Sequence, residues 1–91
     1  MKLNNVNIKL QIPNVKTHMY VSKLISNNNF ISKLKSMAKE LKIISPDSIT
    51  QSTLLDLSLL FTYITEFNNS KVETDEDYMY LMLFILSLKS D

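Results

Sequence analysis

The sequence contains no cysteine, no glycine and no arginine among its 91 residues. Without cysteine there is no disulfide framework and no thiolate metal site, which fits a reducing compartment. Without glycine, the phosphate-binding loops of Walker or dinucleotide type are excluded, because they need close backbone approach where no Cβ intervenes. Without arginine, the chain lacks the bidentate groups that favour guanine edges, phosphates and carboxylates. Together these absences argue against a nucleotide-dependent enzyme.

Candidate catalytic and metal-binding residues are few. His18 is the only histidine, and with no cysteine beside it we expect no catalytic role. The acidic cluster is formed by Glu73, Asp75, Glu76 and Asp77. A calcium loop needs ligands at alternating positions and a glycine at its turn, so these carboxylates are better explained as charges at the positive end of a helix dipole. We therefore expect no enzyme activity, no metal and no cofactor.

Length and composition predict one small globular domain, residues 1–91. A chain of this size buries only about 60–65% of its unfolded surface, so the core is thin. The 45% hydrophobic and 21% charged residues are typical of a folded protein. The N-terminus has no apolar segment followed by a cleavage site, and no run reaches the roughly 18 apolar residues that cross a bilayer. We expect a cytoplasmic protein that does not bind membranes.

Apolar and polar residues alternate over residues 3–12, which predicts a half-buried strand. The apolar members are Val6, Ile8, Leu10 and Ile12. Residues 15–21 either continue this alternation as the second arm of a hairpin or begin a helix, and we favour a helix over residues 17–27 capped by Thr17. A lone strand leaves backbone groups unpaired, so the first strand must pair with residues 15–21, a second copy or a partner protein.

Apolar residues at helical spacing predict three more helices, over residues 29–44, 49–68 and 74–89. Asn29 is expected to cap the first of these, and Thr74 with Asp77 approximates a capping box for the last. In helix 49–68 the expected core stripe is Thr53, Leu57, Leu60, Ile64 and Phe67, and the expected polar side is Gln51, Ser58, Thr62, Thr65 and Asn69. The predicted fold class is mainly α, with an N-terminal strand, alone or in a hairpin, followed by three or four helices in a compact bundle.

The segment YMYLMLFILSL, residues 78–88, is apolar on every side and must be covered on both faces. The side chains expected in the core are Tyr78, Leu81, Met82 and Ile85. Tyr80, Leu83 and Phe84 are left on flanking or outer faces. Either the helix is the fully enclosed centre of the fold, or this second face, together with the adaptable Met79, contacts a partner. This pattern favours a non-enzymatic protein-binding module that forms a homodimer or docks on a larger protein.

Composition adds a hypothesis about origin. All ten basic residues are lysine, and asparagine and isoleucine are abundant, as in the proteins of AT-rich genomes. Small size and the lack of catalytic motifs then suggest a phage or mobile-element protein that acts in the host cytoplasm, as an inhibitor or an assembly chaperone of a larger protein.

Charge is divided unevenly along the chain. Residues 1–45 hold eight lysines and one acid, a net +7, whereas residues 46–91 hold two lysines and eight acids, a net −6, and the sum is +1. Either the two halves face each other, or a basic surface binds a polyanion or an acidic protein. The candidate basic surface consists of Lys33, Lys35, Lys39 and Lys42, which otherwise form the solvated side of helix 29–44.

The segment MAKELKIISPDSITQSTLL, residues 37–55, loosely resembles a helix-turn-helix. That resemblance implies the alternative function, a small nucleic-acid-binding regulator that uses the lysine-rich N-terminal half. The segment departs from the motif because its turn lacks glycine, and because the presumed recognition helix carries Asp47 and Asp56 but no lysine.

Overall fold

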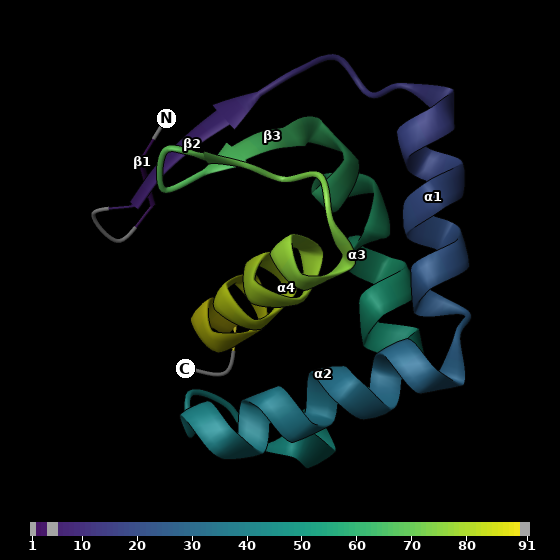
Figure 1. Ribbon diagram of the computed structural model, residues 1–91, viewed down its shortest axis with the longest axis vertical. Coiled ribbons are helices and arrows are strands. Elements are labelled where there is room, and N and C mark those ends of the chain that lie inside the picture. Colours follow the sequence, from purple (N-terminus) through teal and green to yellow (C-terminus); the bar gives the residue numbers. More distant parts are fainter. Residues whose placement is uncertain (1, 4–5, 90–91) are drawn as a thin grey trace.

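The computed structural model describes residues 2–3 and 6–89, which form a mainly helical fold with a small antiparallel sheet (Figure 1). In chain order the elements are β1 (Lys2–Leu3), β2 (Val6–Leu10), α1 (Val15–Ile25), α2 (Asn28–Leu41), the 3-10 turn η1 (Pro46–Ser48), α3 (Gln51–Tyr63), β3 (Ile64–Phe67), β4 (Ser70–Lys71) and α4 (Asp75–Lys89). The predicted fold class is confirmed. Residues 4 and 5 of the predicted first strand lie outside the described residues.

Helix α4 lies at the centre of the fold, between the sheet and α2 (Figure 1). It packs against α2 and α3, and the ring of Phe84 lies 5.0 Å from that of Phe67 in β3. Its buried side chains are Tyr78, Met79, Leu81, Met82, Leu83, Ile85 and Leu86. The segment that is apolar on every side is therefore covered mostly by its own chain.

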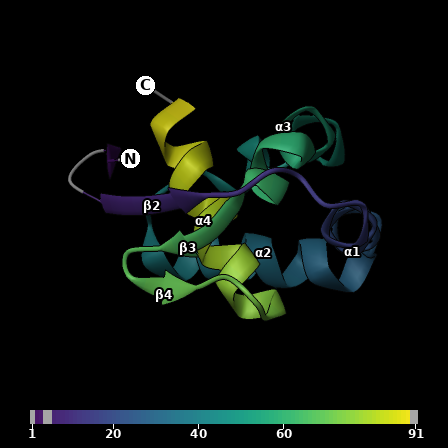
Figure 2. The ribbon, with the colours of Figure 1, turned by 90° about the horizontal axis from the view of Figure 1, so that it is seen from above.

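The first strand pairs within the chain, with a segment that the sequence pattern did not single out. The sheet order is β1-β2-β3-β4, every neighbouring pair is antiparallel, and α1, α2 and α3 lie between β2 and β3 in sequence (Figure 2). Lys9 is opposite Glu66 and Leu10 opposite Ile64, which leaves Thr65 as the extra residue of a bulge. The alternative pairing with residues 15–21 is wrong, because these residues belong to α1.

The predicted helix 49–68 is wrong at both ends, and α3 stops at Tyr63. The next residues form β3, which turns into β4 through Asn68 and Asn69, at φ 53° and 70°. Two central residues with positive φ are typical of a two-residue hairpin turn, and asparagine tolerates this conformation better than other residues with a Cβ. The Asn68 N–H also donates to the carbonyl of Asn7, 2.7 Å away. The turn therefore stabilises a strand where the sequence pattern predicted helix.

Capping side chains set the starts of the first two helices. The Asn14 Oδ1 accepts a hydrogen bond from the N–H of Thr17 at 3.1 Å, so α1 begins at residue 15 rather than 17. The cap of α2 is Asn27, not Asn29, since its Oδ1 accepts from the N–H of Asn29 at 2.9 Å. Helix α2 ends at residue 41 rather than 44, because Lys42 adopts a left-handed conformation with φ 54°.

The predicted capping box of α4 is confirmed. The N–H of Asp77 donates to Thr74 Oγ1 at 3.2 Å, and the N–H of Thr74 donates to Asp77 Oδ2 at 3.0 Å. The N–H of Glu73 donates to the same carboxylate oxygen at 3.2 Å. Hydrogen bonds from the N–H of Thr74 and then of Glu73 lower the pKa of Asp77, because they favour its charged form.

A second contact joins the start of α4 to α1. The Tyr20 hydroxyl donates a hydrogen bond to Asp75, and the Tyr20 ring lies 5.7 Å from that of Tyr78. The hydrogen bond to Asp75, with burial and the negative charge of the carboxylate, raises the pKa of Tyr20 to about 12. The tyrosine therefore stays protonated and connects α1 to α4 through the usual pH range.

Candidate protein-binding surface

Two of the four predicted contact residues of α4 are buried. Leu83 is fully buried and Met79 is buried, so Leu83 does not lie on a flanking or outer face, and the alternative of an enclosed helix describes α4 better. Phe84 is half-buried against Phe67, and Tyr80, which is 50% exposed, lines a shallow hollow beside the β3–β4 hairpin. The reason is that the sheet, α2 and α3 all pack around α4, so it is the enclosed centre of the fold.

The structure instead exposes apolar side chains on α3. Leu55 is 54% exposed, Leu59 52% and Leu60 45%, and we refer to these three residues as the leucine face. Leu59 follows Leu55 by four residues, so the two are neighbours on one side of the helix, and Leu60 lies about 100° further around it. The leucine face is therefore a mostly apolar exposed side of a helix whose other side is in the core.

Helix α3 is rotated relative to the expected orientation. Ser58 and Thr62, predicted on the polar side, are buried, whereas Leu60, predicted in the core stripe, is exposed. The Ser58 hydroxyl donates to the carbonyl of Leu55 at 2.8 Å, and the Thr62 hydroxyl donates to that of Leu59 at 2.7 Å. Because each hydroxyl forms a hydrogen bond within its own helix, burying it costs little free energy.

More exposed apolar side chains lie beside the end of α3. The backbone N–H of Gln11 donates to the carbonyl of Tyr63 at 2.7 Å, and its side chain donates to the carbonyl of Thr62 at 3.4 Å. These bonds hold Leu10 and Ile12 next to the last turn of α3, and Ile12 is 87% exposed. Exposed apolar side chains thus also lie near the end of α3, on the last residue of β2 and in the segment that follows it.

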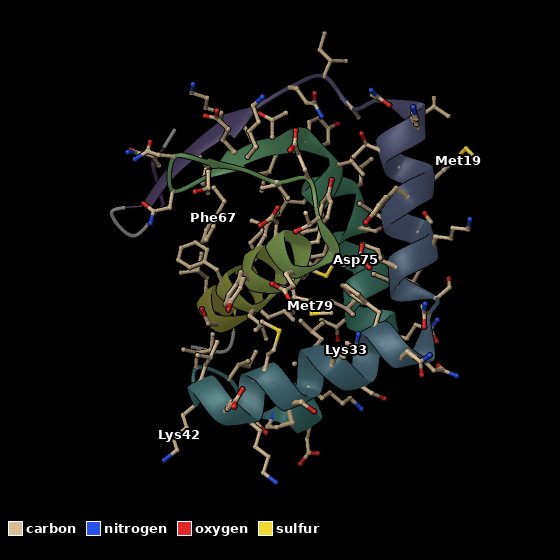
Figure 3. The ribbon with its side chains drawn as sticks, in the orientation of Figure 1. Met19, Lys33, Lys42, Phe67, Asp75 and Met79 are labelled. Atoms are coloured by element: carbon tan, nitrogen blue, oxygen red, sulfur yellow. The ribbon has the colours of Figure 1, made fainter. Side chains whose placement is uncertain are left out.

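A further exposed methionine lies on α1. Met19 is 65% exposed and points outward, away from α4 (Figure 3).

The four lysines of the predicted basic surface are exposed on α2, but they do not form one patch. At about 100° per residue, Lys35 and Lys39 share one side of the helix and Lys33 lies on the opposite flank, while Lys42 follows the last residue of α2 in a left-handed conformation. There Lys33 lines a groove of about 790 Å³ between α2 and α4, together with Asp75 and Met79 (Figure 3). One of the four therefore lies in a solvent-filled groove beside the acidic start of α4.

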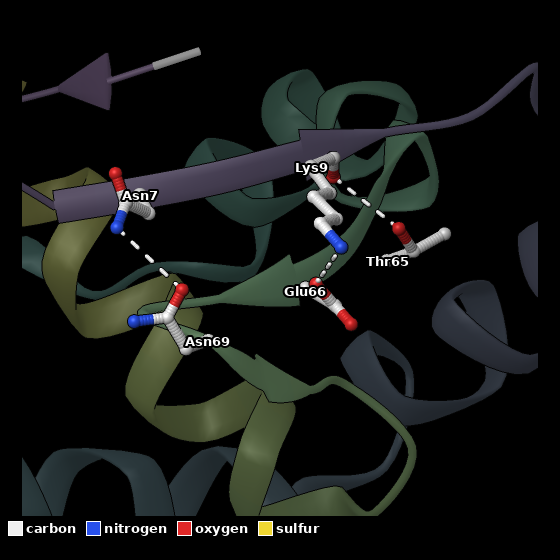
Figure 4. Close-up of polar contacts among 5 residues, drawn as sticks. All are labelled: Asn7, Lys9, Thr65, Glu66 and Asn69. Atoms are coloured by element: carbon white, nitrogen blue, oxygen red, sulfur yellow. Dashed lines mark hydrogen bonds and ion pairs between the residues drawn. The ribbon is translucent and has the colours of Figure 1, made fainter.

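The sheet also brings the basic and acidic halves of the chain together. Lys9 Nζ lies 3.0 Å from Glu66 Oε2, and Glu66 is opposite Lys71 on the next strand (Figure 4). Thr65 at the bulge donates its hydroxyl to the carbonyl of Lys9 at 3.4 Å. The Lys9–Glu66 pair is at the surface, so it contributes at most about 1 kcal/mol.

The loop between α2 and α3 does not have the geometry of a helix-turn-helix. Residues 42–50 include η1, whereas that motif joins its helices by a turn of roughly three or four residues. The exposed residues in the first turns of α3 are Gln51, Ser52, Leu55 and Asp56, none of which is positively charged. This arrangement offers no cation to a phosphate backbone.

Neither a metal centre nor a membrane span is found in the described part of the chain: no group of three or more histidine or acidic side chains is placed to hold a metal ion, and no helix is long and apolar enough to cross a bilayer. The chain matches no protein-family model, no curated protein and no solved structure. No family is assigned. The geometry of the surface is therefore the basis for a functional proposal.

Proposed function

We propose that this chain is a non-enzymatic protein-binding module and that the leucine face of α3 is its main contact surface. The observation that supports this is the exposure of about half of Leu55, Leu59 and Leu60. Exposed apolar side chains grouped on one face often mark interaction sites. Covering such a patch is favourable by roughly 25 cal/mol for each Å² removed from water.

A comparison of the two most apolar helices supports the same surface. Helices α3 and α4 are both apolar around most of their circumference, which is typical of helices with neighbours on all sides. The chain supplies those neighbours for α4, but it covers α3 on only one side. A partner on the leucine face would complete the packing of α3.

The biological role we propose is that of an accessory factor, an inhibitor or an assembly chaperone that docks on a larger protein. A phage or mobile-element origin fits the lysine-only, asparagine-rich composition and the small size of the chain. Such a factor works by occupying a surface, so an exposed apolar face is sufficient for it. Tyr80, the exposed member of the originally predicted contact set, is a secondary contact in this proposal.

The test compares two double variants. Leu55→Gln with Leu59→Gln removes the leucine face, and Leu41→Gln with Ile43→Gln changes two equally exposed apolar side chains at the end of α2. Both variants should retain the far-UV circular dichroism of the unmodified chain. We expect a specific protein captured from host lysate by the unmodified chain and the α2 variant to be lost from the leucine-face variant. Equal recovery by all three would contradict the proposal.

A second candidate function is polyanion binding by Lys35, Lys39 and Lys42. Lys35 and Lys39 share one side of α2 and Lys42 directly follows its last residue, and within residues 2–3 and 6–89 no ion pair joins them to an acid. Binding through three phosphate contacts predicts an affinity for duplex DNA that falls with salt at a log–log slope of about −3. Changing all three lysines to glutamine should abolish binding. No binding at low salt would reject this candidate.

A further inference from the structure

An acidic residue interrupts the leucine face. Asp56 is exposed on α3, three residues before Leu59 and four before Leu60. Residues three and four apart on a helix are surface neighbours, so the carboxylate of Asp56 borders both leucines. Any protein that covers the leucine face must also cover Asp56.

No cation of α3 is available to this carboxylate. Residues 51–63 contain no lysine, and the ion pair found among the described residues, Lys9 with Glu66, is in the sheet. In the free chain Asp56 is solvated by water. A partner that removes this water without supplying a positive charge would leave a carboxylate buried and unpaired, which strongly opposes binding.

The same carboxylate opposes self-association through α3. A second copy related by a two-fold axis would place α3 against α3 and bring two Asp56 carboxylates close together at the leucine face. Like charges repel strongly where water is excluded, and α3 has no lysine to offset the repulsion. The charge of the face therefore favours a different protein over a second copy.

We propose that the leucine face binds an amphipathic helix that carries a lysine or arginine among its apolar residues. The apolar side chains cover Leu55, Leu59 and Leu60, and the cation pairs with Asp56, which makes Asp56 the residue that selects the partner. An amphipathic helix presents its anchoring apolar residues at i, i+3, i+4 and i+7, so one helix face can cover the leucines and place a cation among them. This inference rests on the proposed function and names the class of partner.

The test uses two fluorescent synthetic helices with the same leucine stripe, one with lysine and one with glutamate at its centre. Fluorescence anisotropy measures their affinities for the unmodified chain, Asp56→Asn, Asp56→Lys and the control Asp47→Asn, which alters an exposed acid on η1 outside the leucine face. We expect the unmodified chain and the control to prefer the lysine peptide by about tenfold. Asp56→Asn should lose this preference, and Asp56→Lys should reverse it.

Three results would overturn the inference, and they separate it from the proposed function. If both peptides bind with equal affinity and Leu59→Gln weakens the binding of each, the leucine face binds proteins but does not select them by charge. No binding of either peptide at millimolar concentration would exclude this class of partner, and the lysate comparison above would still decide the proposed function. A dimer in sedimentation equilibrium that is lost in Leu59→Gln would identify a second copy as the occupant.

Discussion

Replacing Leu83 by alanine tests whether α4 is the enclosed centre of the fold. Leu83 is 0% exposed, so the substitution removes three buried carbon atoms and leaves a cavity in a close-packed region. Comparable substitutions cost about 2.7–5 kcal/mol, and we expect about 3 kcal/mol here. A chain of this length is stable by roughly 5–14 kcal/mol, so the loss is a large share of the total. The melting temperature should fall by about 12–24 °C.

The matched control is Leu59→Ala, which makes the same chemical change at a side chain that is 52% exposed. Its free energy of unfolding should change by less than about 1 kcal/mol. Urea unfolding followed by circular dichroism at 222 nm measures both values, and similar slopes would show that the denatured states are comparable. A cost below 1 kcal/mol for Leu83→Ala, or equal costs for the two variants, would refute the enclosure of α4.

Three more predictions follow from local contacts. Asn69→Ala should lower the free energy of unfolding in urea by about 1 kcal/mol because φ is 70° there, whereas Asn69→Gly should not; equal losses would argue against the hairpin turn. The lowered pKa of Asp77 means that its charge stabilises the fold above its unfolded pKa of about 3.9, and this contribution is lost as the pH falls through the lower folded value. Asp77→Asn should therefore lose less stability than the unmodified chain between pH 5 and pH 2 in thermal melts, and identical profiles would refute the link. Tyr20, with its pKa raised to about 12, contributes stability that is present below its unfolded pKa of about 10 and is lost as the pH rises through 12. Ultraviolet titration should show an ionisation near pH 12 that Tyr20→Phe removes, and persistence of that step would contradict the hydrogen bond to Asp75.

Elements defined by local interactions could be predicted from the sequence. Helix α2 follows its apolar periodicity, and the box of Thr74 and Asp77 begins α4 as expected. Both signals involve residues within one or two turns of each other. The errors at these helices are shifts of one to three residues at the ends, such as the cap at Asn27 instead of Asn29.

The strand β3 could not be recognised from periodicity alone. Its residues continue the apolar spacing of α3, so Ile64 and Phe67 fit a helical stripe as well as a strand. The usable signals were the β-branched pair Ile64 and Thr65 and the Asn68-Asn69 turn that follows. These residues form a strand because they pair with β2. Since β2 is distant in sequence, a local pattern does not reveal this pairing.

Which helix is enclosed and which is exposed could not be predicted from the sequence for a similar reason. The sequence predicts α4 as apolar on every side and α3 with a polar side, whereas the packing encloses α4 and leaves leucines of α3 exposed. Hydroxyl groups were expected to face solvent, yet Ser58 and Thr62 bond to carbonyls of their own helix and turn inward. Because Ser58 and Thr62 face the core, Leu55 and Leu59 on the same helix face solvent.

The pairing of β2 with β3 also constrains how the protein is made. Lys9 and Thr65, which are bonded across these strands, are 56 residues apart. At about 5–20 residues per second, a ribosome needs roughly 3–11 s to synthesise the second strand after the first. During that interval the backbone groups of β2 that face β3 have no partner, and Ile8 lacks the core that buries it in the finished fold. Nascent chains are therefore most prone to aggregate through this N-terminal strand before the β3–β4 hairpin leaves the ribosome.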